Sequence, residues 1–191
     1  MLELYPSQSV FVEFGGETAS KRRNQKREVA CKFAPWRLSF PKGWGAPENV
    51  TLDALRSWTE ILGFTAEAKA YSGTAVYETE FDFGEAADGA RCILDLGRVE
   101  SIAKVYLNGK EVRTLWCEPY SCDVTKFVKK GRNFLKVEVT NTWRNRVVYD
   151  LNLPEKDRKT WILYRKNFSP SPESPLIPSG LLGPVTIHLE K

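Results

Sequence analysis

Hydrophobic and polar residues alternate along much of this chain, which is the pattern of strands that bury one face. In the stretch 76–83, Tyr77, Thr79, Phe81 and Phe83 alternate with mainly acidic neighbours. Further stretches with the same period of two are 92–96, 103–107, 135–140 and 185–190. Because successive side chains of a strand point to opposite faces of a sheet, we expect each stretch to form a strand with one buried face.

Turn signals separate the predicted strands. Asn108-Gly109 stands between the stretches 103–107 and 111–115, and both residues tolerate the positive φ angles of a two-residue hairpin turn. The strands recur about every ten to fifteen residues, which favours an antiparallel sandwich over a parallel α/β sheet. The sequence therefore predicts an all-β fold, a jelly-roll β-sandwich with about eight or more strands and little helix.

Little of the chain has the pattern of a helix. Only the stretch 52–62 could hold a helix of any length, with Asn49 or Thr51 as its N-cap. The stretches 40–47 and 61–73 look irregular, as does 154–178, which contains five prolines. A loop as long as this last one is usually functional or packed across a neighbour.

Composition places the chain among globular proteins. It has 191 residues, 42% of them apolar and 12% aromatic, which suits one domain or one domain with an appended segment. No apolar run reaches the ~18 residues of a transmembrane helix, so no membrane partner is expected. The N-terminus lacks the regions of a signal peptide. The protein is thus expected to be cytoplasmic, or else part of a longer chain that would be periplasmic or extracellular if secreted.

The formal net charge of +4 is modest and is concentrated in the stretch 21–27, where five of seven residues are basic. Such a run either binds nucleic acid or forms a solvated turn between strands. No fold signature for nucleic-acid binding accompanies it, which favours the turn and no nucleic-acid partner.

The four cysteines show no metal-binding spacing, and the single histidine, His188, cannot complete a zinc site. Cys117 and Cys122 flank four residues and could approach each other, whereas Cys92 alternates with leucines and is expected in the core. Free buried thiols are the expected state.

A series of motifs runs from position 95 to position 150. In chain order they are Asp95-Leu96-Gly97-Arg98-Val99, 103–110, Asp123-Val124-Thr125, Lys130-Gly131-Arg132-Asn133 and Val139-Thr140-Asn141-Thr142-Trp143. Asp123 is expected to accept the backbone N–H of Thr125 in an Asx-type turn. In this order the motifs resemble the galactose-binding-like, sugar-binding β-sandwich domain of family 2 glycoside hydrolases and of related α-L-rhamnosidase-like enzymes. The resemblance covers about residues 58 to 187, and its late elements, 143–150 and 178–185, favour the rhamnosidase-like branch.

The resemblance implies a noncatalytic carbohydrate-binding or accessory domain of a glycoside hydrolase. The stretch 9–14 resembles a strand that ends a preceding module in the rhamnosidase-like enzymes. Residues 1–40 are therefore expected to be the end of a preceding β module or N-terminal strands packed on the sandwich, and residues 41–191 the sugar-binding-type sandwich itself. In these enzymes the catalytic carboxylates lie in a separate α/β barrel, which makes a barrel of the same polypeptide the expected protein partner.

The residues themselves show no catalytic machinery. A glycosidase needs two carboxylates across the scissile bond, and the chain has 24 acidic residues without a paired motif. Asp95, Glu138 and Asp150 stand out most, yet none identifies an acid or a base. A barrel and this sandwich do not fit together in 191 residues. We expect no catalytic residues and no activity in the isolated chain.

Sugar binding requires an aromatic face for the C–H groups of the ring and planar polar side chains for its hydroxyls. Candidates for the aromatic face are Trp116, Tyr120, Trp143 and Trp161, and candidates for the hydrogen bonds are Asn141, Arg144, Asn145, Arg146 and Asp150. The site assigned from these is Trp143, Asn145, Arg146 and Asp150, with Trp116 and Tyr120 nearby. The alternative is a packed loop whose Arg–Asp pair and Asn side chains satisfy backbone groups. Three other tryptophans are expected in core or inter-module contacts: Trp36, Trp44 and Trp58.

Two functions remain open, sugar binding and the bracing of a catalytic barrel. The binding of one structural metal ion also remains open. A sugar binder should expose a concave site with a solvent-facing Trp or Tyr and unpaired polar groups, whereas a module that braces a catalytic barrel should expose a flat apolar patch. The resemblance leaves a structural calcium ion from noncontiguous loops open, although no D-x-D-x-D-G loop is present. No other cofactor or metal is expected.

Overall fold

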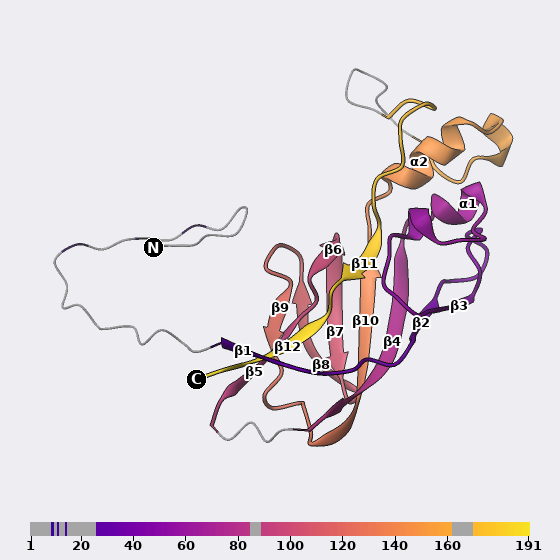
Figure 1. Ribbon diagram of the computed structural model, residues 1–191. Helices are drawn as coiled ribbons and strands as arrows, with labels where there is room; N and C mark the ends of the chain where they lie inside the picture. Colours follow the sequence, from indigo (N-terminus) through magenta and orange to yellow (C-terminus); the bar gives the residue numbers. More distant parts are fainter. Residues whose placement is uncertain (1–8, 10, 12–13, 15–25, 85–88, 162–169) are drawn as a thin grey trace.

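The computed structural model describes residues 26–84, 89–161 and 170–191, together with positions 9, 11 and 14. In this part of the chain two antiparallel sheets form a sandwich (Figure 1). The larger sheet has the order β3 (Asn49–Leu52), β2 (Trp36–Ser39), β4 (Thr74–Phe83), β10 (Gly131–Thr140), β7 (Ile102–Leu107) and β8 (Lys110–Leu115). The smaller has the order β1 (Lys26–Val29), β12 (Thr186–Glu190), β5 (Arg91–Asp95) and β9 (Ser121–Asp123). The predicted all-β sandwich is confirmed.

A third, short sheet consists of two strands. In it β6 (Arg98–Glu100) pairs with β11 (Gly180–Gly183) in antiparallel fashion. Gly97, which leads into β6, approaches Gly183 so closely that a Cβ atom on it would lie 2.5 Å from the Gly183 carbonyl carbon and oxygen. Its φ of 64° is also one that glycine tolerates best, so this crossing requires glycine at position 97.

The core lies between the sheets and is built from the inward positions of the alternating strands. Tyr77, Phe81 and Phe83 of β4 are almost fully buried, as the two-residue period predicts. The same is true of the predicted inward residues Cys92, Leu94, Leu96, Ala103, Val105, Leu107, Leu135, Val137 and Val139. Burying one large apolar side chain stabilises a fold by about 1.5–3 kcal/mol, so these rows supply the main driving force for the sandwich.

The hairpin between β7 and β8 turns at Asn108-Gly109, with φ angles of 53° and 79°. The Asn108 amide also donates to the Phe127 carbonyl (2.8 Å) and to Oδ1 of Asn133 (2.9 Å), while its own Oδ1 accepts the N–H of Phe134. The predicted hairpin is confirmed, and its turn residue additionally ties the hairpin to β10.

The predicted Asx-type turn is confirmed as well. Oδ1 of Asp123 accepts the backbone N–H of Thr125 at 2.9 Å. The Thr125 hydroxyl in turn accepts the N–H of Cys92 at 2.8 Å. The turn therefore fixes the start of β5 as well as the end of β9.

Strands on both sides of position 40 belong to the same sheets. β1 pairs with β12, and β2 pairs with both β3 and β4. The stretch 26–39 is therefore part of the sandwich. Most of the stretch 9–14 and residues 21–25 of the basic run lie outside the described residues, so the expectations placed on them stay predictions.

The helix predicted over 52–62 is wrong. β3 ends at Leu52, and the following chain forms only the 3-10 turn η1 (Trp58–Glu60), capped by Ser57. Trp58 has no exposed surface, and its indole N–H donates to the Tyr77 hydroxyl at 2.6 Å. Burial of this large ring in the core and the pairing of β3 with β2 outweigh local helix propensity.

The helices of the structure lie together at one end of the sandwich (Figure 1). They are α1 (Ala66–Lys69), α2 (Arg144–Leu151), and the 3-10 turns η1 and η2 (Glu155–Asp157). The periodicity of the sequence does not reveal α2, because its buried face carries Asn145, Arg146 and Asp150 besides Val148. We call this end, with the loops around α2, the helical end.

Two further observations concern the chain as a whole. The described part holds no helix that is both long and apolar enough to cross a membrane. All four cysteines are free thiols, as expected, and Cys117 does not pair with Cys122. Only Cys92 and Cys122 are buried, whereas Cys31 is half-buried and Cys117 is exposed. Burial raises the pKa of the Cys92 and Cys122 thiols to about 12, so both are unreactive core residues.

Candidate functional site

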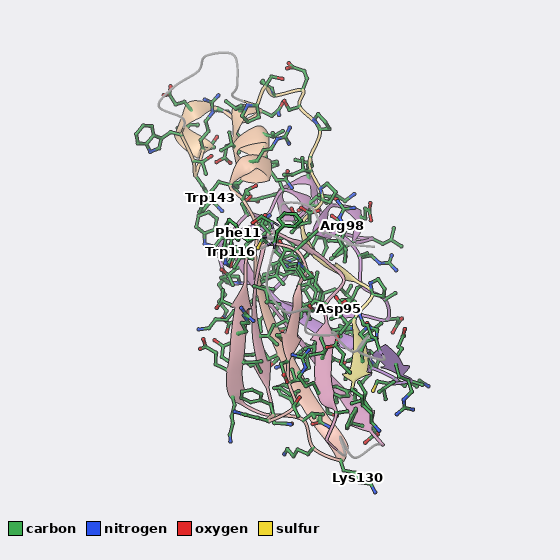
Figure 2. The ribbon with its side chains drawn as sticks, turned by 90° about the vertical axis from the view of Figure 1, so that its left-hand side faces the viewer. Phe11, Asp95, Arg98, Trp116, Lys130 and Trp143 are labelled. Carbon is green, nitrogen blue, oxygen red and sulfur yellow. The ribbon has the colours of Figure 1, made fainter. Side chains whose placement is uncertain are left out.

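Trp143 lies at the helical end, where β10 passes into α2. It is the N-cap residue of α2 and remains 51% exposed. Its ring contacts that of Trp44, with centroids 5.6 Å apart and planes tilted by 58°. Figure 2 shows Trp143 and Trp116 toward the helical end and Lys130 at the opposite end of the molecule. The predicted aromatic face is thus available to solvent.

Asn145, the next predicted sugar contact, is buried with 1% exposure. Its amide donates to the Ile177 carbonyl at 2.8 Å and its Oδ1 accepts the Ile177 N–H at 2.9 Å. The same amide also donates to the Ser179 hydroxyl at 3.1 Å. Asn145 therefore pairs like a strand with the backbone at Ile177 and clamps this segment against α2.

Arg146 and Asp150 are equally buried, one helical turn apart on α2. Nε of Arg146 lies 2.9 Å from Oδ1 of Asp150, and its Nη1 lies 2.9 Å from Oε1 of Glu67 on α1. The other carboxylate oxygen of Asp150 accepts the N–H groups of Lys159 (2.9 Å) and Thr160 (2.7 Å). The pair joins α1, α2 and the chain after η2.

Electrostatic interactions keep the carboxyl groups of Asp150 and Glu67 ionised. Burial alone would raise the pKa of Asp150, but the hydrogen bonds from Thr160 and Arg146 outweigh it and hold the pKa below its usual range. The hydrogen bond from Arg146 is the main reason why the pKa of Glu67 is lowered. The network is therefore charged, with one guanidinium between two carboxylates.

These positions correct the expected site. Asn145, Arg146 and Asp150 do not present polar groups to a ligand, because they are buried and bound to Glu67, Ile177 and the backbone at 159–160. Nε of Arg146 and Oδ1 of Asp150 make no hydrogen bond of regular geometry, but they face each other as an ion pair. The geometry is that of the packed-loop alternative. Their role is to hold the helical end together beneath Trp143.

Trp116 and Tyr120 lie in the connection between β8 and β9 and differ from each other. Trp116 is 74% exposed, whereas Tyr120 is buried and its hydroxyl donates to the Ser101 carbonyl at 2.5 Å. β7 lies between β10 and β8, so Trp116 and Trp143 follow strands that are about 10 Å apart. Tyr120 is thus a core residue, and Trp116 is a separate exposed ring at the same end.

Sequence reasoning missed two residues of this surface, Trp44 and Lys159. Trp44 was expected in a core or inter-module contact. It is half-buried and packs against the core, and it also supports Trp143. Lys159 Nζ lies 5.6 Å from the Trp44 ring centroid and binds the Gly43 carbonyl at 2.7 Å and Glu67 at 3.2 Å. No local signal marks either residue, since both contacts depend on the tertiary fold.

The carboxylates that stood out in the sequence serve the fold. Asp95 accepts the N–H of Gly97 at 2.9 Å, and Glu138 pairs with Lys136 at 2.8 Å. His188 on β12 contacts the Thr186 hydroxyl at 2.9 Å. Among the residues that the structure describes, no three His, Cys, Asp or Glu side chains gather to hold a metal ion. The calcium ion left open by the resemblance stays a prediction.

Comparison with known proteins gives the relatives of this chain. A curated relative from Formosa agariphila, whose name assigns it to the beta-glucuronidases, is 33% identical over 207 aligned positions, which cover 97% of this chain and 18% of the relative. The structure of a rhamnosidase from Novosphingobium sp. PP1Y superposes with a TM-score of 0.78 at 35% identity, covering 88% of this chain and 16% of that one.

A more distant neighbour shares the fold alone. This is an uncultured Clostridium sp. beta-glucuronidase, with a TM-score of 0.50 and 23% identity over 69% of this chain and 24% of that one. The chain therefore spans less than a fifth of the length of the two more similar proteins.

The family follows from a match at the level of the domain. Residues 65–172, more than half of the chain, match the family model described as glycosyl hydrolase 2 galactose-binding domain-like. This region runs from the start of α1 through β4 to β10 and past α2, so it includes the helical end. On this evidence the chain belongs to the glycosyl hydrolase 2 galactose-binding domain-like family.

Proposed function

We propose that the chain is a noncatalytic accessory module of a larger glycoside hydrolase, and that it binds carbohydrate on the exposed ring of Trp143. Its family and the small share of each glycoside hydrolase relative that it covers support the accessory role. A catalytic barrel of the same polypeptide is the proposed protein partner. The beta-glucuronidase and rhamnosidase names of the relatives suggest uronic acids and L-rhamnose as ligands to test.

The observation that carries the carbohydrate proposal is the half-exposed Trp143 ring backed by Trp44. The ring position is fixed because Trp143 starts a helix whose next residues are anchored by buried polar contacts. A sugar ring that stacks on such an indole gains on the order of 1 kcal/mol beyond simple area burial. A single fixed ring supports weak binding, on the order of millimolar, or about −4 kcal/mol.

The test is a titration followed by proton–nitrogen NMR. L-rhamnose, D-galactose and D-glucuronate are added separately to the wild type and to Trp143→Ala. We expect at least one sugar to shift resonances around Trp143, including its indole N–H, and expect those shifts to be lost in the variant.

A matched control comes from the same strand. Phe134 is another partly exposed aromatic residue, near the other end of β10, and Phe134→Ala should leave the titration unchanged. If the resonances of residues around Trp143 still shift in Trp143→Ala, this ring is not the site.

A second candidate function, bracing, has an observation of its own. Ile102 and Trp116 are 41% and 74% exposed. Ile102 pairs with Thr140 at the end of β10 that leads to Trp143, and Figure 2 shows Trp116 toward the same end. With Asn145 and Arg146 turned inward, this end presents apolar rings with few polar groups for hydroxyls, which suits packing on another domain. The same titration separates the two functions, since a brace gives no shift with any sugar.

A further inference from the structure

A pocket of about 400 Å³ lies beside α2, on residues that the Trp143 site does not use. Val147 and Leu151 of α2 line it, together with Glu155, Arg158, Thr160 and Trp161 from the chain that follows. Its volume falls in the range of about 300–1,000 Å³ that small-molecule sites occupy.

The part of the pocket wall formed by residues 158–160 is held in place by hydrogen bonds. Asp150 accepts the N–H groups of Lys159 and Thr160 and also the Thr160 hydroxyl, at 2.7–2.9 Å. Nε of Arg158 donates to the Leu153 carbonyl at 2.9 Å, which ties the loop back to the end of α2. A ligand would therefore meet a formed wall and would not have to order it.

The positive and negative groups that line the pocket nearly balance when the residues already ion-paired within the protein are left out. The carboxylate of Asp150 is neutralised by Arg146, and the ammonium of Lys159 by Glu67. Glu155 and Arg158 remain, one acceptor and one donor. Among the described residues, the exposed Glu155 carboxylate has no hydrogen-bond or ion-pair partner within the protein.

The remaining wall is aromatic. Trp161 lines the pocket and is 80% exposed. In the part of the chain that the structure describes, no buried aromatic ring packs against it. An indole face, a carboxylate that accepts from two hydroxyls and a guanidinium that donates to ring or hydroxyl oxygens are the groups that a sugar ring requires. An open concave site with a solvent-facing Trp and an unpaired polar group is also what distinguishes a binder from a brace.

We propose that this pocket is a second carbohydrate site and that it takes one neutral monosaccharide unit. A neutral ring satisfies Glu155 and Arg158 through hydroxyls, whereas a uronate would bring a second negative charge into a pocket that already holds the unpaired Glu155 carboxylate. The inference rests on the proposed carbohydrate-binding function for its class of ligand only, because Trp143 does not line the pocket.

The two sites are linked by Lys159, which lines the pocket and lies over the Trp44 ring that supports Trp143. At 1.5 Å per residue, Trp143 and Leu151 are about 12 Å apart along the axis of α2. Contact with both sites at once would therefore require a ligand longer than one sugar ring.

The test uses the isolated chain, L-rhamnose, D-galactose and D-glucuronate, and proton–nitrogen NMR. We expect a neutral sugar to shift the indole N–H of Trp161. Trp161→Ala and Glu155→Gln should each weaken that binding about tenfold, which corresponds to ~1.4 kcal/mol. The matched control is Asp157→Asn, which removes a second acidic charge from the same turn without touching the pocket.

The outcomes separate this proposal from the Trp143 site. Shifts lost in Trp161→Ala but kept in Trp143→Ala support the pocket alone. Shifts lost in Trp143→Ala and unchanged in Trp161→Ala and Glu155→Gln overturn the pocket and leave the Trp143 site standing. No shift with any sugar overturns both, and D-glucuronate binding at least as tightly as the neutral sugars overturns the choice of a neutral ring.

Discussion

The guanidinium of Arg146 is buried, yet it contacts two carboxylates, those of Glu67 and Asp150. A buried ion pair contributes little by itself, because desolvation offsets the attraction between the charges. Removing one partner is nevertheless costly, because the other charge stays buried without full compensation. Asp150 additionally holds the backbone at Lys159 and Thr160, so its loss would loosen the wall of the pocket.

We expect Asp150→Asn to lower the free energy of unfolding by about 3 kcal/mol at pH 7, measured by urea denaturation. The neutral amide keeps the shape of the side chain but removes one of the two negative charges around Arg146. Asp157→Asn, an exposed acidic residue near by, is the control and should change stability by less than about 0.5 kcal/mol. An equal effect of both substitutions would contradict a special role for the buried pair.

Asp150, together with Glu67, predicts that the stability of the fold depends on pH. The pKa values of Asp150 and Glu67 are lowered from their usual 3.8 and 4.5, so the unfolded chain binds protons before the folded one does. Their contribution is complete above these usual values and is lost as the pH falls through the lower folded values. Urea denaturation should therefore show a stability loss below about pH 4 that is smaller in Asp150→Asn than in the wild type.

Among the elements, the β7–β8 hairpin depends most directly on its own sequence. Asn108 supplies a positive φ angle and three side-chain hydrogen bonds, to Phe127, Asn133 and Phe134. The helix α2 is the opposite case. Its sequence carries polar residues on the buried face, and contacts with other segments decide that it is helical.

Asn108→Ala is expected to destabilise the chain by about 3 kcal/mol. It loses the hydrogen bonds, and it leaves in the left-handed region a residue without the local side-chain hydrogen bonding that lets asparagine tolerate it. Asn108→Gly loses the same bonds, but glycine tolerates the left-handed region, so its loss should be smaller by about 1 kcal/mol. Thermal or urea unfolding measures both, with the exposed neighbouring Lys110→Ala as control. Equal losses in the two Asn108 variants would show that the turn angle contributes nothing.

At the scale of the whole molecule, the sandwich presents carboxylates that serve structure and aromatic rings that face solvent. Asp95, Glu138 and Asp150 each bind a neighbour within the fold. The family and the small share of the relatives covered agree with an accessory role.

The isolated chain should therefore not hydrolyse aryl glycosides. Assays with aryl α-L-rhamnoside and aryl β-galactoside are expected to give no turnover above the rate without protein, because hydrolysis needs an acid and a base on either side of the scissile bond and Asp95, Glu138 and Asp150 are engaged within the fold. Turnover that a single Asp or Glu substitution abolishes would refute this. Residual turnover that survives every such substitution would instead indicate a contaminating enzyme.

The candidate site shows where sequence reasoning reaches its limit. The sequence singles out the cluster 141–150 as aromatic and polar, and the structure leaves Trp143 half-exposed. Which of its polar residues face solvent could not be predicted, because the period of α2 is hidden by its buried polar face. The pocket next to it depends on Trp161, whose aromatic character was visible but whose neighbours were not.

The sequence by itself determined the strands, their inward faces, the Asn108-Gly109 hairpin and the turn at Asp123, because each depends on side chains a few positions apart. Tertiary structure decided the rest. Glu67 and Arg146 are 79 positions apart and meet only when α1 and α2 pack at the same end of the sandwich. The identity of a polar residue does not show whether its side chain will be buried or exposed. Only the partners that folding brings to Asn145, Arg146 and Asp150 make them interior contacts, while Trp143 and Trp161 remain exposed.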